Sequence, residues 1–232
     1  GAIVGVAVGG GSLQTSSNGA TDDGSAVQFA LYGSYQSGRF FVDGQGDYLH
    51  VDQDVRRTLS FWNAGTHGSN SVNGGGVQVD AGLRYGFGRW QVDPTLGLSA
   101  MSLSAGSVAE DTGGALAEQI GSQSITSLQS LAGVRVATDF AVTPRVPLRV
   151  HALLGWVHEY KDTDARMSAS LPLIGSGVFD SGTVPVARNA ARIGAGFDVA
   201  VTQKVSVYGS YQATLGADTT AQYLTGGVRM VW

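Results

Sequence analysis

The chain has 232 residues, with 14 Lys+Arg against 18 Asp+Glu and a net charge of −4, which argues against a nucleic-acid partner because such a partner calls for a basic surface. It has no cysteine, which excludes a disulfide framework and thiolate metal sites. Charged residues make up only 14%, against roughly 25% in soluble domains, yet no apolar run reaches the roughly 18 residues of a membrane helix. Together with 35 glycines, this composition favours a membrane β-barrel over a soluble β-rich protein.

The first residues, 1–11, lack an initiator Met and the basic stretch that opens a signal peptide. A barrel of the outer membrane has to be exported, and export requires such a peptide. The sequence is therefore expected to be an internal piece of a longer precursor.

Ten segments alternate apolar residues with polar or small ones, which is the period-two pattern of a β-strand. Most have about 10 residues or more, the length with which a tilted strand crosses a bilayer, whereas soluble strands more often have about 5–6. In 76–87, for example, Val77, Val79 and Leu83 fall on one face, and Gln78 and Asp80 fall on the other. The segments are 2–13, 25–36, 39–52, 76–87, 89–102, 123–139, 147–160, 187–201, 203–215 and 220–232.

The connections between these segments alternate in length. Long polar stretches are expected to be loops at 14–24, 53–75, 103–122 and 161–186, and a shorter one at 216–219. Tight turns are expected at 37–38, 88, 143–145 and 202–203. Outer-membrane barrels place short turns on the periplasmic side and long loops outside. The pattern predicts an all-β, antiparallel, up-and-down transmembrane barrel with both chain ends on the periplasmic side.

Charged and polar side chains fall on the face opposite to the apolar one, which would be the inside of a barrel. Buried charges must be paired or hydrated. They would line a water-filled pore and contact a threaded segment, or neutralise one another across the wall, and both interpretations stay open. The predicted pore-lining residues are Asp43, Gln45, Asp47, Asp80, Arg84, Asp93, Arg135, Arg149, Glu159, Arg192 and Asp198.

The last segment carries a pattern that resembles the assembly signal of outer-membrane proteins. It has a polar residue at Thr225, a glycine at Gly227, and hydrophobic residues at Met230 and Trp232. The barrel-assembly machinery is thought to bind such a strand by edge pairing, which is β-augmentation.

Short motifs in a fixed order make the chain resemble the autotransporter β-domain family. Each motif alone is weak, but together they span nearly the whole chain. They lie at 29–35 (FALYGSY), 41–46 (FVDGQG), 83–87 (LRYGF), 90–94 (WQVDP), 133–135 (GVR), 149–159 (RVHALLGWVHE), 192–196 (RIGAG) and 207–211 (VYGSY).

The resemblance implies a twelve-stranded barrel with a helix threaded through its pore, in which residues 1–13 correspond to the third strand. The helix and the first two strands have no counterpart here, so we expect an N-terminally truncated barrel domain over 1–232, with ten of twelve strands. The implied function is to anchor an N-terminal passenger domain in the bacterial outer membrane and to assist its secretion. The implied partners are outer-membrane lipid and lipopolysaccharide, the passenger with its helical linker, and the barrel-assembly machinery.

Two other functions stay open at this point. One is a free-standing porin or structural barrel. The other is an outer-membrane protease of the omptin type, for which Asp22–Asp23 and His158–Glu159 are the candidate catalytic pairs. None of the four histidines forms a pair with the H-x-x-x-H spacing of metal ligands. The sequence predicts no metal, no cofactor and no enzymatic activity.

Overall fold

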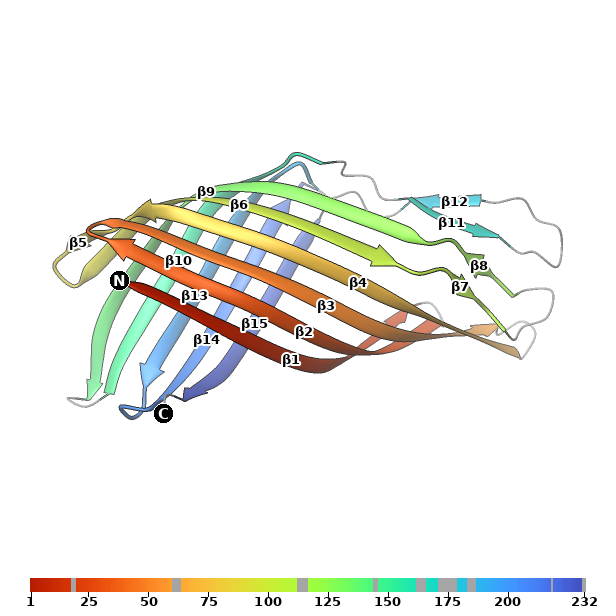
Figure 1. Ribbon diagram of the computed structural model, residues 1–232, viewed down its shortest axis with the longest axis horizontal. Helices are drawn as coiled ribbons and strands as arrows, with labels where there is room; N and C mark the ends of the chain where they lie inside the picture. The colour runs from red at the N-terminus through yellow and green to blue at the C-terminus, as the bar shows by residue number, and fades with distance from the viewer. Residues whose placement is uncertain are drawn as a thin grey trace.

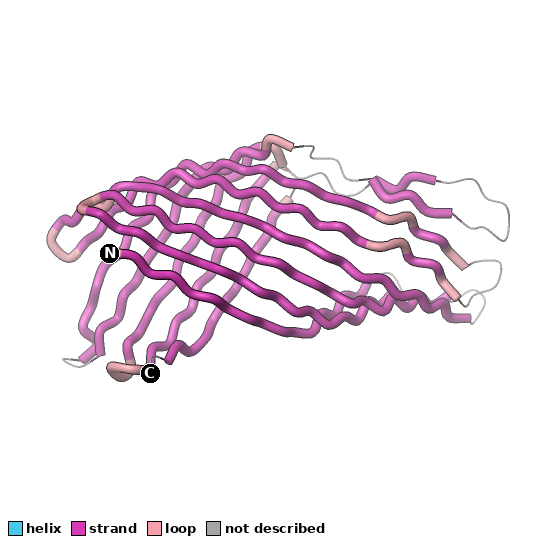
Figure 2. The backbone as a smooth tube through the Cα atoms, viewed as in Figure 1, coloured by secondary structure: helices cyan, strands magenta, loops and turns pink. Residues whose placement is uncertain are grey.

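The computed structural model describes residues 1–17, 20–59, 64–111, 117–143, 146–161, 166–170, 179–182, 187–217 and 219–230. Strands and their turns make up these residues, and none of them is helical (Figure 2). The described part of the chain thus contains no helix with the length and apolar character needed to cross a membrane.

Ten long strands form one antiparallel sheet in which each strand pairs with its neighbours along the chain. The sheet curls into a half-barrel with tilted strands (Figure 1). Each strand matches one of the ten predicted segments, so the predicted all-β, up-and-down architecture is confirmed. The strands are β1 (Ala2–Ser17), β2 (Ala20–Ser37), β3 (Phe40–Leu59), β4 (Ala64–Leu83), β6 (Trp90–Ala105), β9 (Gln123–Thr143), β10 (Val146–Glu159), β13 (Asn189–Ala200), β14 (Val205–Gly216) and β15 (Thr220–Met230).

The segment predicted as one strand over 76–87 is interrupted at Arg84. Its remainder is β5 (Tyr85–Phe87), which pairs with the start of β6. The turns that follow β2 and β5 contain Gly38 and Gly88, whose φ angles are 58° and 61°. Only glycine adopts this left-handed conformation without a steric cost, so these glycines fix the two tight turns.

The two faces of the sheet differ in chemistry, as the alternation predicts. Residues opposite each other in register share a face, so Asp43 on β3 meets Asp80 on β4, and Val42 meets Ala81. Large apolar side chains lie exposed on the convex face, among them Leu224 at 85% and Leu96 at 69%. Apolar side chains outside and carboxylates inside are the reverse of a soluble protein and suit a wall that faces lipid.

Both chain ends lie at the end of the half-barrel that carries the tight turns (Figure 1). β1 and β15 stand at the two edges of the sheet, and within the described residues each pairs on one side only. The wall is therefore open between β1 and β15.

The expected long loops are in large part strands, and this expectation was wrong. Residues 14–17 and 20–24 extend the β1–β2 hairpin, and 53–59 and 64–75 extend the β3–β4 hairpin. Within 103–122 and 161–186, the structure forms a second sheet in the order β12-β11-β8-β7. Its strands are β7 (Val108–Ala109), β8 (Gln119–Ile120), β11 (Arg166–Ser170) and β12 (Phe179–Gly182).

The physical reason is that a hairpin already registered in the membrane can continue in water with polar side chains on both faces. Each backbone group still finds its partner in the neighbouring strand, and polar cross-strand pairs add to this. The amide of Gln14 donates a hydrogen bond to Asp23 at 2.9 Å, and that of Gln53 donates one to Asp22 at 3.2 Å. A search for apolar alternation misses such strands.

Candidate functional site

The concave face of the sheet is the candidate functional site, because polar and charged side chains converge there. Each of the residues predicted to line a pore lies on this face, through a cavity it borders or a partner it binds. That these residues line a water-filled pore remains a prediction.

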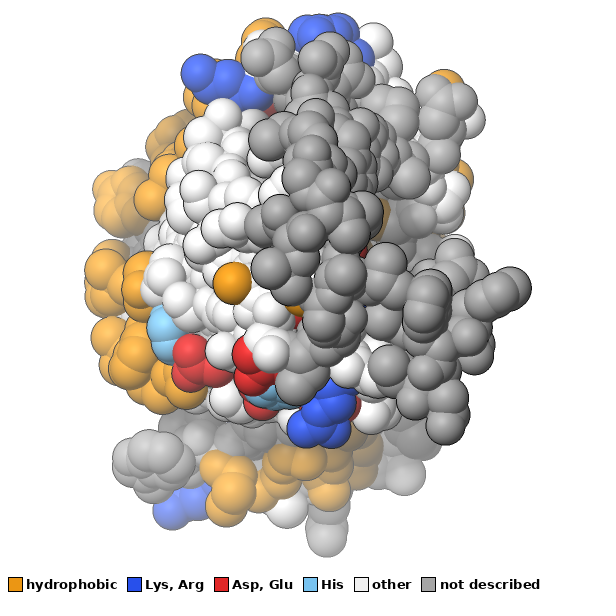
Figure 3. All heavy atoms as spheres, turned by 90° about the vertical axis from the view of Figure 1, so that its right-hand side faces the viewer, with side chains coloured by type: hydrophobic (Ala, Val, Ile, Leu, Met, Phe, Trp, Pro, Cys, Tyr) orange, Lys and Arg blue, Asp and Glu red, His pale blue; other side chains and the backbone are white. Residues whose placement is uncertain are grey.

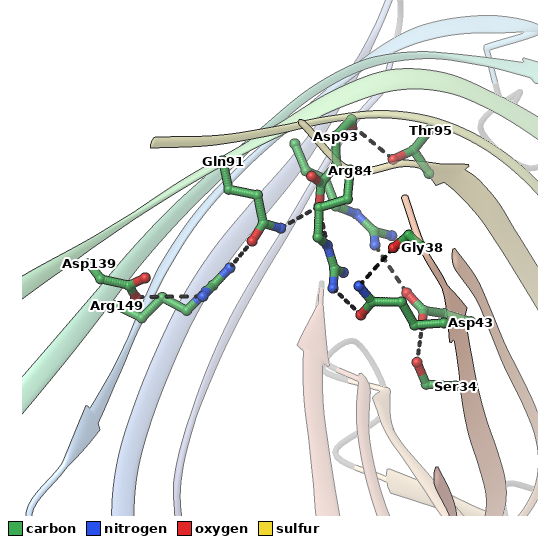
Figure 4. Close-up of polar contacts among 11 residues, drawn as sticks. Ser34, Gly38, Asp43, Arg84, Gln91, Asp93, Thr95, Asp139 and Arg149 are labelled. Carbon is green, nitrogen blue, oxygen red and sulfur yellow. Dashed lines mark hydrogen bonds and ion pairs between the residues drawn. The ribbon is translucent and has the colours of Figure 1, made fainter. Parts of the chain in front are cut away.

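At the tight-turn end, side chains from four strands form a chain of polar contacts (Figure 4). The guanidinium of Arg84 donates to Gln36 at 2.6 Å and lies 3.5 Å from the carboxylate of Asp93. The amide of Gln91 donates to the same carboxylate at 2.6 Å and accepts from Arg149 at 2.8 Å. Arg149 in turn pairs with Asp139 on β9 at 3.5 Å. This chain ties β2 to β10 across the inside of the wall.

Arg135 on β9 joins strands that are not adjacent in the sheet. Its guanidinium donates to Asp80 on β4 at 2.8 Å and lies 3.5 Å from Asp43 on β3. Asp43 also accepts a hydrogen bond from Ser34 at 2.7 Å. The carboxylate of Asp80 is 8% exposed, so Arg135 supplies the charge that a buried acid needs. Two acids and one arginine thus connect β3, β4 and β9.

Gly97 on β6 makes the contact between Asp80 and Arg135 possible. A Cβ atom at this position would lie 2.2 Å from a carboxylate oxygen of Asp80. Any side chain there would displace the acid that crosses β6 toward β9. The glycine is therefore required by close approach, and not by its backbone angles.

Further from the tight turns, the concave face encloses a cavity of about 430 Å³. Asp47 and Arg192 border it from opposite parts of the wall, and Gln45, Gln212 and Tyr223 are among its other lining residues. Arg192 donates to Gln129 at 3.3 Å, but its Nε atom is buried and has no hydrogen-bond partner among the described residues. One acidic and one basic side chain, Asp47 and Arg192, therefore border the cavity.

An ion pair of a histidine with an aspartate lies on the inner wall near the carboxyl-terminal strands. His151 on β10 lies 3.7 Å from Asp198 on β13. His151 also borders a second cavity, of about 380 Å³, together with Arg84, Arg135 and Arg149. These contacts place His151 on the same concave face as Arg149.

At the end opposite to the tight turns, two acids are held by dense hydrogen bonding. Glu159 is 4% exposed and accepts hydrogen bonds from Ser127, from the amide of Gln129 and from the backbone of Leu128. Glu110, beyond β7, accepts from Arg57 at 2.6 Å and from Thr66 at 2.6 Å. The contacts of Glu159 join β10 to β9, and those of Glu110 fasten the second sheet to the β3–β4 hairpin.

Glu110 lies outside the membrane-spanning part of the wall, and its environment shifts its titration. Burial raises the pKa of this carboxyl, but hydrogen bonds from Arg57, Thr66 and the backbone of Glu118 outweigh burial, so the pKa lies below its ordinary value. The hydrogen bond between Arg57 and Glu110 also raises the pKa of Arg57. Glu110 is therefore ionised and paired at neutral pH.

The residues of the assembly-like signal lie on β15, apart from Trp232, which lies outside the described residues. Thr225 is opposite Ser210, and Gly227 is opposite Tyr208. A Cβ atom on Gly227 would lie 2.6 Å from the hydroxyl of Tyr208, so the glycine receives the tyrosine ring. Met230 is 64% exposed.

Sequence reasoning missed several members of the polar network. Gln36, Gln91 and Gln129 link charged residues to one another, and Asp139 pairs with Arg149. Alternation could have found all four, because each occupies an inward position of its strand. The predicted pore-lining set included one amide, Gln45, but none of these three, and it left out Asp139 at the end of its segment.

The two residue pairs suggested for a protease have other partners in the structure. His158 contacts Asn189 at 2.9 Å and stacks near Trp156 and Tyr160 on the outer surface, whereas Glu159 points to the concave face. Asp22 accepts from Gln53 instead of contacting a histidine. Among the described residues, no group of three or more His, Asp or Glu could hold a metal ion.

Comparison with known proteins adds to this geometry. The autotransporter beta-domain family matches residues 1–212. The chain belongs to this family. Autotransporter beta-domains are barrels of the bacterial outer membrane, which places this chain there.

Two solved structures share the fold. The translocator domain of the autotransporter NalP from Neisseria meningitidis is 17% identical with a TM-score of 0.71, covering 100% of this chain and 76% of that one. The beta domain of the Bordetella autotransporter BrkA is 14% identical with a TM-score of 0.57, covering 100% of this chain and 91% of that one.

A curated relative has a similar sequence. An extracellular serine protease of Serratia marcescens is 22% identical over 200 residues, which cover 85% of this chain. The match spans only 19% of that protein's length, about a fifth. The name of the relative therefore describes a protein much larger than the matched region.

Proposed function

We propose that this autotransporter beta-domain is a translocator that anchors an N-terminal passenger in the outer membrane and assists its secretion to the cell surface. The observation that carries the proposal is the contrast between the two faces of one curled sheet. Exposed apolar side chains cover the convex face, and ion pairs and amides cover the concave face. Such a wall separates lipid from a polar interior.

The occupant of the interior is proposed to be the helical linker that joins passenger and barrel. A cavity of about 430 Å³ with Asp47 and Arg192 on its walls offers an acid and a base to a polar segment. Arg192 donates to Gln129 at 3.3 Å, which holds its guanidinium at the cavity wall, where a polar segment would meet it. In this proposal the domain makes and breaks no covalent bond.

Two more strands, pairing with the free edges of β1 and β15, are proposed to complete a twelve-stranded wall. An open backbone edge cannot be satisfied by hydrocarbon, which supports closure. The tight-turn end, with both chain ends, is proposed to face the periplasm. The assembly machinery is proposed to bind β15 through Thr225, Gly227, Met230 and Trp232, and lipopolysaccharide to surround the opposite end.

The test is surface display of the passenger by the full-length protein in a Gram-negative host. An epitope placed in the region upstream of residue 1 should become accessible to antibody and added protease on intact cells. Deletion of β14 and β15 should abolish this accessibility. Heat-modifiable migration on gels reports in parallel whether the barrel has folded.

A folded barrel whose upstream region stays in the periplasm would contradict the translocator function and favour a porin or structural barrel. Surface display that persists without residues 1–232 would contradict it as well. Peptide cleavage by the refolded barrel in lipopolysaccharide would instead support the protease alternative.

A further inference from the structure

The tight-turn end carries basic side chains without acidic neighbours in the turns. Arg39 follows Gly38 between β2 and β3, Arg89 follows Gly88 between β5 and β6, and Lys204 precedes β14. The described turn residues 37–39, 88–89 and 201–204 contain no Asp or Glu. These three turns therefore present only positive charge.

Arg39 and Arg89 differ from the arginines of the concave face in their partners. Arg84, Arg135 and Arg149 each pair with an aspartate. Arg39 and Arg89 are exposed and form no ion pair with any described residue.

Instead, both guanidiniums lie over rings of the outer surface. That of Arg39 is 5.3 Å from the ring centre of Tyr85, and that of Arg89 is 5.8 Å from Trp90 and 5.3 Å from Phe140. Aromatic contact holds a guanidinium in place and leaves its donors free for an anion.

An apolar groove opens on the convex face directly beside Arg39. It encloses about 480 Å³ and is lined by Phe40, Ala81, Leu83, Pro94, Leu96 and Ala132, among others. Phe40 is the next residue after Arg39 and lies opposite Leu83 in register. Two small alanines between large side chains make this depression, which is apolar over most of its surface.

We propose that the groove and the two arginines bind one anionic phospholipid of the periplasmic leaflet. An acyl chain lies in the groove, and the phosphate accepts hydrogen bonds from Arg39, with Arg89 adding charge further along the rim. The proposal rests on the orientation given under Proposed function, with the tight turns at the periplasm. Lipopolysaccharide occupies the other leaflet and would not reach this end.

An anionic headgroup fits better than a zwitterionic one because the described turn residues 37–39 and 88–89 offer guanidiniums and no acid for an ammonium group. A basic residue near an anionic membrane surface contributes about 1 kcal/mol, which corresponds to about fivefold in affinity. A bidentate guanidinium–phosphate contact adds geometric selectivity to this attraction. The groove supplies the apolar contact that a soluble phosphate lacks.

The experiment uses the intact full-length protein in nanodiscs of phosphatidylcholine containing one-fifth phosphatidylglycerol. After transfer to the gas phase, native mass spectrometry counts the lipids of each class that remain bound. We expect phosphatidylglycerol to be retained above its share in the disc. In the double variant R39Q/R89Q, the preference for phosphatidylglycerol should fall about fivefold for each arginine that is replaced. Ala81→Phe, which fills the groove, should lower retention of phosphatidylglycerol while the arginines remain.

Arg56→Gln is the matched control, because Arg56 is an exposed arginine at the opposite end of β3. Its lipid retention should equal that of the wild type. Retention in proportion to disc composition by the wild-type protein would overturn the proposal, as would unchanged retention in both R39Q/R89Q and Ala81→Phe. A partner of another class is indicated if the double variant loses binding to peptidoglycan fragments only, and this too would overturn it.

Passenger display, measured for the same proteins in cells, separates this inference from the proposed function. Display by the wild type without lipid preference refutes the lipid site alone. Absence of display from a folded wild-type barrel refutes the translocator function, whatever the lipid result.

Discussion

The two halves of the wall differ in height. β1 to β4, β6 and β9 have 16 to 21 residues, whereas β10, β13, β14 and β15 have 11 to 14. A tilted strand needs about 9–11 residues to cross a bilayer. The carboxyl-terminal half is thus little more than a membrane crossing. The amino-terminal half continues beyond the membrane at the end opposite to the tight turns (Figure 1).

Along β3, in the amino-terminal half, the outer face changes from one that suits lipid to one that suits water. On the outer face of β3, Tyr48 is followed at alternate positions by His50, Asp52 and Asp54. Figure 3 shows the molecule from the end opposite to the tight turns. Apolar side chains gather on the outer flank, and charged and histidine side chains gather on the end of the wall. The membrane part is therefore held from inside by a polar network, and the extension is held by ion pairs in contact with water.

The largest effect is expected for Arg135→Met in the membrane part. The substitution removes the cation that pairs with the buried Asp80 at 2.8 Å, and removal of one partner of a buried pair costs about 3–5 kcal/mol. Because Arg135 is itself 34% exposed, we expect a loss near the lower limit, about 3 kcal/mol. Urea unfolding of the intact protein in lipid vesicles, followed by heat-modifiable migration, measures this loss.

Arg149→Met is the matched control for Arg135→Met. Its acidic partner, Asp139, is 65% exposed, so we expect a loss below about 1 kcal/mol. Equal losses in the two variants would mean that burial of the acid does not determine the strength of the network.

A smaller and local effect is expected for Glu110→Gln in the extension. The variant weakens the contacts with Arg57 and Thr66, which fasten β7 to the β3–β4 hairpin. A hydrogen bond to a charged group contributes about 1.5–3 kcal/mol, so we expect the opening free energy of this region to fall by about 2 kcal/mol. Hydrogen exchange should rise in residues 50–72 and stay unchanged in 146–159.

The pH dependence of the wild type gives a check on Glu110→Gln. Because the folded-state pKa of Glu110 lies below its ordinary value, its contribution is present above the ordinary pKa and lost as pH falls through the folded-state pKa. Protection at 50–72 should therefore be similar at pH 7 and pH 5 and fall only in stronger acid. Glu118→Gln, at 3.4 Å from Arg57, should have a smaller effect.

The same contrast explains how far the sequence predicted the structure. Lipid on one side and a polar interior on the other impose strict alternation, so the ten crossings, the face of Arg135 and the tight turns at Gly38 and Gly88 could be read from residue types. Water on both sides imposes no alternation, and the strands beyond Gln53 were therefore mistaken for loops.

The partners of the inward residues could not be predicted from one strand at a time. Arg135 reaches Asp80 across β6, and this contact depends on the stagger of three strands and on the absence of a side chain at Gly97. Alternation gives the face of a residue but not its height along the wall. The polar network is therefore a product of register, which only the paired strands reveal.

The smallest effect, and a gain, is expected for Asp22→Asn near the tip of the β1–β2 hairpin. Burial raises the pKa of Asp22, and the charges of Asp23 and Asp54 raise it further. A raised folded-state pKa means that Asp22 favours the folded state below its unfolded pKa and that this contribution is lost as pH rises. At pH 7 the ionised acid is therefore unfavourable, and asparagine should stabilise the hairpin by roughly 0.5 kcal/mol while keeping an acceptor for Gln53. Hydrogen exchange over 14–24 should slow at pH 7 but not near pH 3, where the wild-type acid is protonated.

Asp23→Asn should bring no gain, because Asp23 already accepts from Gln14 and lies 3.9 Å from Arg56. A gain from Asp23→Asn equal to that from Asp22→Asn would attribute the effect to the net charge of the hairpin and not to the burial of Asp22.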